Sequence, residues 1–106
     1  MGFREADWLS CVGDGWWHLV RPLLDRCRKE DVDVYQVKEK FGGLRFYAGY
    51  CSEELQQMIE DAEKASRVTC ETCGSPGRRR GGGWIKTLCD EHANERPVVS
   101  LARESS

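Results

Sequence analysis

The chain has 106 residues, of which 40% are hydrophobic and 32% are charged. That composition excludes an intrinsically disordered chain, and the length allows one small domain with a thin core. The formal net charge of −2 excludes binding of nucleic acid through bulk positive charge. Because no apolar run approaches the roughly 18 residues of a membrane span and no secretory signal pattern is seen, we expect a cytoplasmic protein with no membrane partner.

A first helix is expected after an irregular segment, residues 1–13. Asp14 is a residue type that caps helix N-termini, and apolar side chains recur after it at helical spacing: Trp17, Val20, Leu24 and Cys27. Pro22 interrupts the pattern because it lacks an N–H group and crowds the preceding turn. The sequence therefore predicts a helix that kinks at Pro22, or one that starts near Arg21 after a separate first turn.

Residues 32–50 change to the pattern of a β-hairpin, in which β-branched and aromatic residues flank Gly42-Gly43. On the first strand, alternation separates two pairs onto opposite faces, Tyr35 with Val37 and Val34 with Gln36. On the second strand it separates two further groups, Leu44 with Phe46 and Ala48, and Arg45 with Tyr47. Because both faces are partly apolar, we expect both to be covered.

Ser52 is a good N-cap for a second helix over residues 53–66, whose first turn carries Glu53 and Glu54, where the helix dipole favours acids. Pro97 ends whatever helix begins near Cys89, and residues 98–101 read as a short edge strand. We therefore expect a single α+β domain with three parts. These are a helix, β-hairpin and helix in residues 1–66, a zinc-binding module in 67–97, and a short strand and tail in 98–106.

Two pairs of metal-type ligands lie in the C-terminal third. Cys70 and Cys73 form a C-x2-C pair, and Cys89 and His92 form a C-x2-H pair, with 15 residues between the pairs. Four nitrogen and sulfur ligands at this spacing predict one structural zinc ion. Asp90 and Glu91 suit the start of a helix, which favours a treble-clef-like module over a zinc ribbon with two knuckles.

Other roles for these cysteines fit the sequence less well. A redox C-x-x-C pair is typical of a βαβ setting, which the sequence does not predict. A catalytic zinc ion needs an open coordination position, whereas four good ligands close the site. The remaining cysteines form no knuckle, so we interpret Cys11, Cys27 and Cys51 as small buried or partly buried hydrophobic residues.

A basic loop, Arg78–Arg80 followed by three glycines and Trp84, lies between the ligand pairs. Arginine supplies planar donors for phosphate or carboxylate, and tryptophan can stack on a base, so one interpretation is contact with nucleic acid or with an acidic protein face. The other is a solvated turn with Trp84 packed on the zinc module. Three residues near the hairpin turn extend this patch if they lie on the same side: Lys38, Lys40 and Arg45.

Four stretches stand out as motifs: GDGW at 13–16, QVKEKFGGLRFY at 36–47, the run ending in TCETCG at 62–74, and GWIKTLCDEH at 83–92. Together they resemble a family of small proteins encoded in phages, prophages and bacterial genomes. The resemblance implies a compact fold with a C-terminal zinc-binding module and a phage or mobile-element setting. It supplies no catalytic residue.

These observations predict a small, non-enzymatic, zinc-stabilised binding protein that acts through protein–protein interaction. The resemblance adds the expectation of a phage-type inhibitor of a host defence or nucleic-acid-processing complex. The alternative is a nucleic-acid-binding zinc finger that uses Arg78–Arg80, whose affinity would fall steeply with salt.

Overall fold

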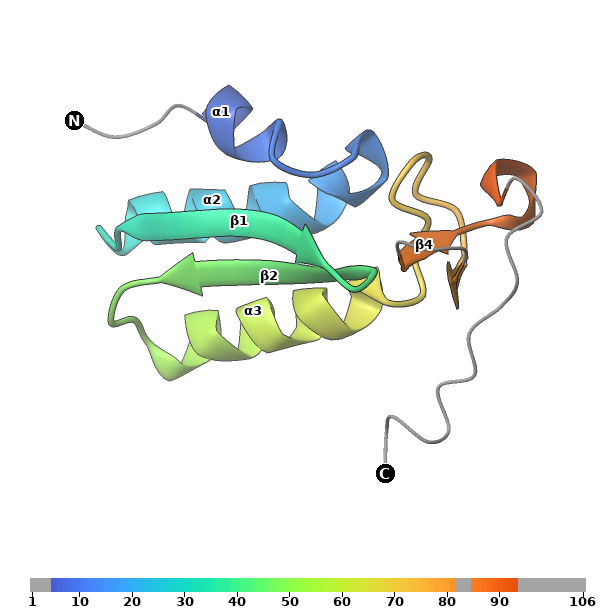
Figure 1. Cartoon of the computed structure of the whole chain (residues 1–106). Coiled ribbons are helices and arrows are strands. Elements are labelled where there is room, and N and C mark those ends of the chain that lie inside the picture. The colour runs from blue at the N-terminus through green and yellow to red at the C-terminus, as the bar shows by residue number, and fades with distance from the viewer. Residues whose placement is uncertain (1–4, 82–84, 94–106) are drawn as a thin grey trace.

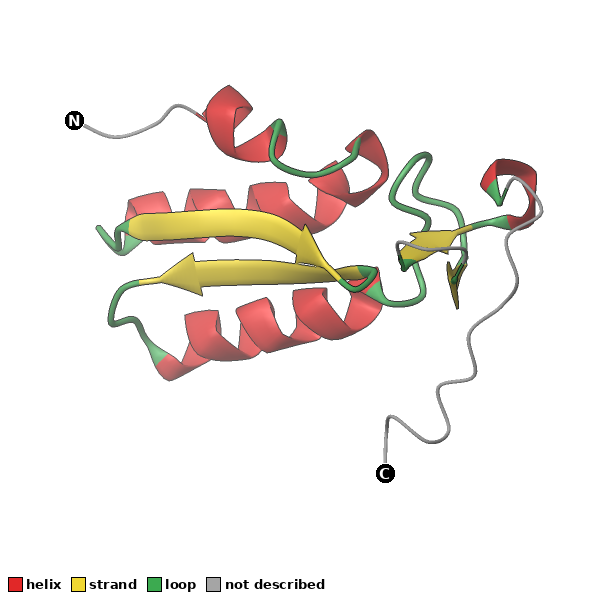
Figure 2. Ribbon diagram, viewed as in Figure 1, coloured by secondary structure: helices red, strands yellow, loops and turns green. Residues whose placement is uncertain are grey.

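The structure is a computed structural model, and it describes residues 5–81 and 85–93 (Figure 1). Helices and two small antiparallel sheets alternate along the chain, which confirms the predicted α+β class (Figure 2). The elements are α1 (Glu5–Leu9), the 3-10 turn η1 (Asp14–Trp16), α2 (Trp17–Lys29), β1 (Val34–Lys40), β2 (Gly43–Ala48), α3 (Glu53–Ser66), β3 (Arg78–Arg80), β4 (Lys86–Leu88) and the 3-10 turn η2 (Asp90–His92). The predicted strand at 98–101 and the tail lie outside the described residues.

The β1–β2 hairpin packs with one face against the helices, and the β3–β4 sheet lies at the end where this hairpin turns (Figure 1). The side chains between them form the main core: Trp16, Val20, Leu23, Leu24, Cys27, Val37, Leu44, Phe46, Leu55, Ile59 and Ala62. Helix α3 also covers the open edge of β2, because Ser66 Oγ and Glu63 Oε2 accept hydrogen bonds from the N–H groups of Leu44 and Phe46. This edge is therefore closed to further strands.

The N-terminal helices differ from the prediction. Residues 5–9, expected to be irregular, form α1. Asp14 makes no capping hydrogen bond to α2, whose N-cap is Trp16, and α2 continues through Pro22. Pro22 is exposed, and so is His18 four residues earlier. Because proline has no N–H group, the carbonyl of His18 lacks its helical hydrogen bond. Water can bond to this carbonyl instead, which explains why the helix does not end at Pro22.

A β-bulge at Tyr35 changes which residues of β1 face the core. Val34 and Gln36 pair with consecutive residues of β2, so Tyr35 is the extra residue between them. Tyr35 and Gln36 therefore share the outer face, while Val34 and Val37 both lie on the core side. The predicted grouping of Tyr35 with Val37 is wrong, because strict alternation does not hold across a bulge.

The hairpin turn consists of Phe41 and Gly42, since Lys40 already pairs with Gly43. Its φ angles are 53° at Phe41 and 78° at Gly42. Positive φ at both central residues is typical of a type I′ turn, which matches the twist of the flanking strands. Glycine adopts this backbone readily, whereas Phe41 is an uncommon residue there.

The outer face of the β1–β2 hairpin is open to solvent. The side chains of Tyr35 and Tyr47 are 65% and 45% exposed. Both long helices, α2 and α3, contribute their apolar residues to the core on the inner side. The prediction that both faces of the hairpin are covered is therefore wrong for the described part of the chain.

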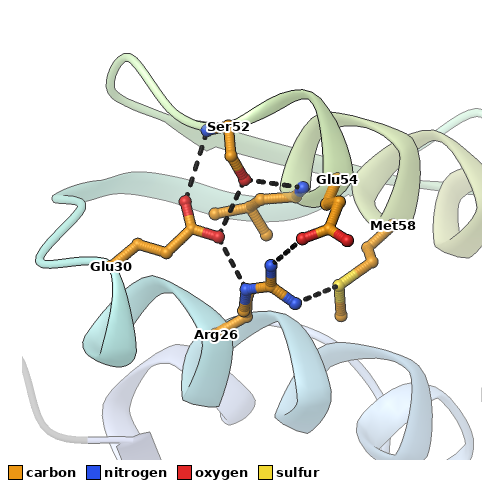
Figure 3. Close-up of polar contacts among 6 residues, drawn as sticks. Arg26, Glu30, Ser52, Glu54 and Met58 are labelled. Carbon is orange, nitrogen blue, oxygen red and sulfur yellow. Dashed lines mark hydrogen bonds and ion pairs between the residues drawn. The ribbon is translucent and has the colours of Figure 1, made fainter.

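A polar network joins the end of α2 to the start of α3 (Figure 3). Arg26 donates to Glu30 at 2.6 Å and also to Glu54, and the hydroxyl of Ser52 donates to Glu30 at 2.8 Å. The same hydroxyl oxygen accepts from Leu55 N–H at 3.1 Å, which confirms Ser52 as the N-cap of α3. Hydrogen bonds from Ser52, followed by those from Arg26, hold the pKa of Glu30 below its usual value.

Replacing this cap should weaken the fold by a modest amount. Ser52→Ala is expected to lower the free energy of unfolding by about 1 kcal/mol, because Leu55 N–H loses its acceptor. Urea denaturation followed by circular dichroism measures the change. Ser52→Thr keeps the hydroxyl group and should cost less than half as much. Equal losses in the two variants would show that the hydroxyl is not the cause.

Candidate metal centre

Four ligand-type side chains meet beside the β3–β4 sheet. Cys70 and Cys73 lie in a turn that follows α3, Cys89 directly follows β4, and His92 ends η2. Their ligand atoms all lie within 4.8 Å of one another. The structure therefore brings together all four predicted ligands in a group that can hold a metal ion.

The contacts within this group connect the two sequence pairs. Cys89 Sγ lies 3.2 Å from Nδ1 of His92, and Cys70 Sγ lies 3.7 Å from the same nitrogen. Cys73 Sγ lies 3.7 Å from Cys89 Sγ. Each pair thus faces the other across a space of the size that one ion occupies.

The turn that carries Cys70 and Cys73 depends on Gly74. The φ angle of Gly74 is +86°, in the left-handed region that glycine adopts most readily. Its N–H donates to the carbonyl of Cys70 at 2.8 Å, and Cys70 N–H donates to Ser75 at 2.7 Å. These bonds form a tight knuckle, residues 70–75, which turns both thiols toward the second ligand pair.

Backbone hydrogen bonds favour the thiolate form of Cys70. Burial raises the pKa of this thiol, but N–H groups of Cys89, Cys73 and Thr72 outweigh that effect and bring its pKa down to about 6. For Cys89, burial is the main cause that raises the pKa of the thiol. Because metal ions bind the thiolate, the backbone around Cys70 prepares that residue as a ligand.

The GDGW motif packs directly on this knuckle. Gly15 N–H donates to the carbonyl of Glu71 at 3.0 Å, and Nε1 of the fully buried Trp16 donates to the carbonyl of Thr69 at 2.8 Å. These contacts join segments more than 50 residues apart in the chain. The spacing of residues in the sequence did not predict these contacts. The sequence indicated only that GDGW is a motif, without showing what it packs against.

Glu71 ties the knuckle to β4. Its N–H donates to the carbonyl of Thr87 at 3.0 Å, and its carboxylate accepts from Thr87 N–H at 3.0 Å and from Lys86 Nζ at 3.2 Å. The buried Thr87 then donates its hydroxyl to the carbonyl of Gly42 at 2.5 Å. The candidate metal centre therefore also holds the turn of the β1–β2 hairpin.

The three arginines between the ligand pairs are not equivalent. They form strand β3, in which Arg78 is exposed, Arg79 is half-buried and Arg80 is only 7% exposed. Arg80 donates through Nε to the carbonyl of Leu88 at 2.9 Å, and it pairs with Asp90 at 2.8 Å. The sequence predicted that Arg80 contacts a partner. Its side chain instead bonds within the module, to Leu88 and Asp90. Trp84 lies outside the described residues.

The other predicted contact residues gather on the β1–β2 hairpin. Lys38 lies directly opposite Arg45, and Lys40 opposite Gly43, so all three basic side chains are on the outer face. The structure places Lys38, Lys40 and Arg45 on one face of the hairpin, and it does not test the prediction that this face continues the patch of Arg78–Arg80. Their joint use with Arg78 stays a prediction.

The other three cysteines differ in their surroundings. Cys27 is 1% exposed in the core, and burial, with smaller effects from Cys51 and Glu30, raises its pKa to about 11. Cys51 is half-buried, as expected, whereas Cys11 is exposed and the prediction of a buried residue is wrong there. Within residues 5–81 and 85–93, these cysteines do not join a metal-type cluster.

No protein-family model, curated protein or solved structure matches the chain. The resemblance to small phage and bacterial proteins therefore stays a prediction, as do the protein partner, the inhibitory role, the cytoplasmic location and the division at residues 66 and 67. Within the described ranges, the helices are too short or too polar to cross a membrane.

Proposed function

We propose that Cys70, Cys73, Cys89 and His92 bind one structural zinc ion. A tetrahedral ion with Zn–S bonds of about 2.3 Å and a Zn–N bond of about 2.0 Å separates two sulfurs by about 3.8 Å, and a sulfur from the nitrogen by about 3.5 Å. Cys73 Sγ lies 3.7 Å from Cys89 Sγ, and Nδ1 of His92 lies 3.2 Å from Cys89 Sγ and 3.7 Å from Cys70 Sγ. All four ligand atoms lie within 4.8 Å of one another. The agreement of these three contacts to within a few tenths of an ångström, in one cluster of four zinc-type ligands, is the observation that carries the proposal.

The ligand set favours a structural role for the zinc ion over a catalytic one. Three thiolates and one imidazole complete a tetrahedron, whereas catalytic zinc sites keep a position for water or substrate. The ion would supply folding free energy and hold the knuckle against β4 and η2. The order of knuckle, β3–β4 hairpin and helical turn supports a treble-clef-like module.

The function that this arrangement supports best is recognition of a partner without chemistry. Zinc binding would fix the knuckle, Glu71 would carry that constraint to Thr87, and Thr87 would position the turn of the β1–β2 hairpin. An exposed surface with aromatic and basic side chains lies next to that turn. The chain is accordingly a zinc-stabilised binding protein whose recognition surface is the hairpin.

Metal analysis of the purified chain tests the zinc site. We expect one equivalent of zinc by elemental analysis, and intense visible d–d bands on replacement by Co²⁺, because tetrahedral thiolate sites give such bands and octahedral sites give weak ones. The variant Cys11→Ser is the control, since Cys11 is exposed and is not part of the cluster. A substoichiometric metal content, or a weak octahedral cobalt spectrum, would overturn the assignment.

A further inference from the structure

Exposed aromatic rings and basic side chains lie close together on the outer face of the β1–β2 hairpin and at its turn. Tyr35, Phe41 and Tyr47 are 65%, 57% and 45% exposed. The basic residues on this face are Lys38, Lys40 and Arg45. The ammonium group of Lys38 lies 6.0 Å from the ring centre of Tyr47, and that of Lys40 lies 5.7 Å from the ring centre of Phe41.

The positive charge of this face works against the fold. Lys38 and Arg45 are directly opposite each other on neighbouring strands, and like charges in that position are destabilising. The ion pairs among the described residues use other basic side chains, such as Arg26 and Arg80, so they leave this repulsion in place. Unfavourable charge pairs are expected on surfaces that bind a ligand. A bound anion would neutralise the repulsion between Lys38 and Arg45.

Arg67 extends the basic surface, although the sequence did not indicate it. A Cβ atom placed on Gly43 would lie 3.7 Å from Cγ of Arg67 and 3.8 Å from its Nε. The exposed Arg67 side chain therefore crosses the outer side of Gly43, next to the position of Lys40. Four basic groups thus line a face whose register positions hold no acidic residue.

We propose that this outer face binds single-stranded nucleic acid. Unpaired bases stack on exposed aromatic rings, and small sheets that bind RNA hold about two or three bases in this way. A base stacked on Tyr47 or Phe41 would bring its phosphate within reach of the neighbouring lysine. From Gly43 to Tyr47 strand β2 spans about 13 Å at 3.3 Å per residue, and Phe41 in the turn lies beyond its start, so the surface is long enough for a short oligonucleotide.

A nucleic acid explains this surface better than a protein partner does. The cores of protein–protein interfaces are depleted in lysine, yet Lys38 and Lys40 stand directly beside the aromatic rings. Their charges would have to be desolvated against a protein, whereas phosphates neutralise them. The inference rests on the proposed function, because the zinc module holds the turn that carries Phe41.

Fluorescence anisotropy with labelled oligonucleotides tests the proposal on the full, zinc-loaded chain. The probes are oligo-dT and oligo-U of about 12 nucleotides and a duplex of the same length. We expect binding of the single strands that weakens with salt, and weaker binding of the duplex. Tyr47→Ala should reduce the affinity by about 10- to 100-fold through loss of stacking, while Tyr47→Phe should keep most of it.

Charge-reversal variants distinguish binding of the nucleic acid to the outer face of the hairpin from non-specific attraction between the nucleic acid and positive charge elsewhere on the protein. Arg45→Glu is expected to weaken binding by at least about 10-fold. It also places a carboxylate opposite Lys38 and should not lower the melting temperature, so weaker binding cannot be attributed to unfolding. Lys29→Glu, on the exposed end of α2, makes the same change in net charge and should alter the affinity by less than about 2-fold.

Three results would overturn the inference. They are no anisotropy change with any probe at low salt, equal losses for Arg45→Glu and Lys29→Glu, and a preference for the duplex. If the folded, zinc-loaded chain instead bound a protein through Tyr47 and Arg45, the nucleic-acid assignment would fail and the proposed function would stand. A chain without zinc would point to failure of the proposed function itself, so the metal content is measured in every sample.

Discussion

Gly15→Ala is expected to lower the free energy of unfolding by about 4 kcal/mol or more, a large part of the roughly 5–15 kcal/mol that stabilises a typical domain. A Cβ atom at this position would lie 2.0 Å from the carbonyl oxygen of Cys70 and 2.6 Å from the nitrogen of Gly74. Both are backbone atoms of the knuckle, so no side-chain rotation relieves the overlap. The turn η1 would have to move away from the knuckle, and the hydrogen bond from Gly15 N–H to Glu71 would break.

The matched control is Gly43→Ala. The nearest heavy atom to a Cβ atom on Gly43 is 3.6 Å away, an ordinary contact, and the φ angle of Gly43 lies outside the left-handed region. This variant should stay within about 0.5 kcal/mol of the parent. Urea denaturation in the presence of excess zinc, followed by circular dichroism, compares the two. Unfolding of Gly15→Ala at the parental midpoint would mean that GDGW does not pack on the knuckle as described.

The features that the sequence predicted correctly depend on local patterns. Helix α3 has the predicted bounds because its cap at Ser52, its acidic first turn and its apolar spacing all lie within 15 consecutive residues. The C-x2-C and C-x2-H pairs were recognisable because ligand type and spacing within each pair are set by a single turn. The β1–β2 hairpin was recognisable from its composition and its glycines.

The features that the sequence did not predict depend on contacts between distant segments. Three consecutive arginines suggested a basic patch, but the β3–β4 pairing buries Arg80 and brings it to Asp90, ten residues later. The bulge at Tyr35 is set by which residues of β1 meet the core, and strict alternation cannot show it. Trp16 could be assigned to the core, yet its hydrogen bond to Thr69 depends on where the knuckle docks.

Cys89→Ser is expected to destabilise the helices together with the metal module. At a free zinc concentration of about 1,000 times the dissociation constant, the ion stabilises the folded state by about 4 kcal/mol, and loss of a ligand removes most of that. For a chain of this size the melting temperature should fall by about 15 °C or more. The exposed Cys11 is not part of the cluster, so Cys11→Ser should melt within about 2 °C of the parent.

The destabilisation by Cys89→Ser should extend from the metal module to the helices, because hydrogen bonds join the module to the core. Trp16 donates to Thr69 beside the first ligand, and Thr87, two residues before Cys89, donates to Gly42 of the hairpin turn. Circular dichroism reports the helices and Trp fluorescence reports the core, so coincident shifts in both would identify one cooperative unit. If Cys89→Ser lost zinc while both transitions kept the parental midpoint, residues 1–66 would fold without the metal. The predicted division after residue 66 would then separate two independent units.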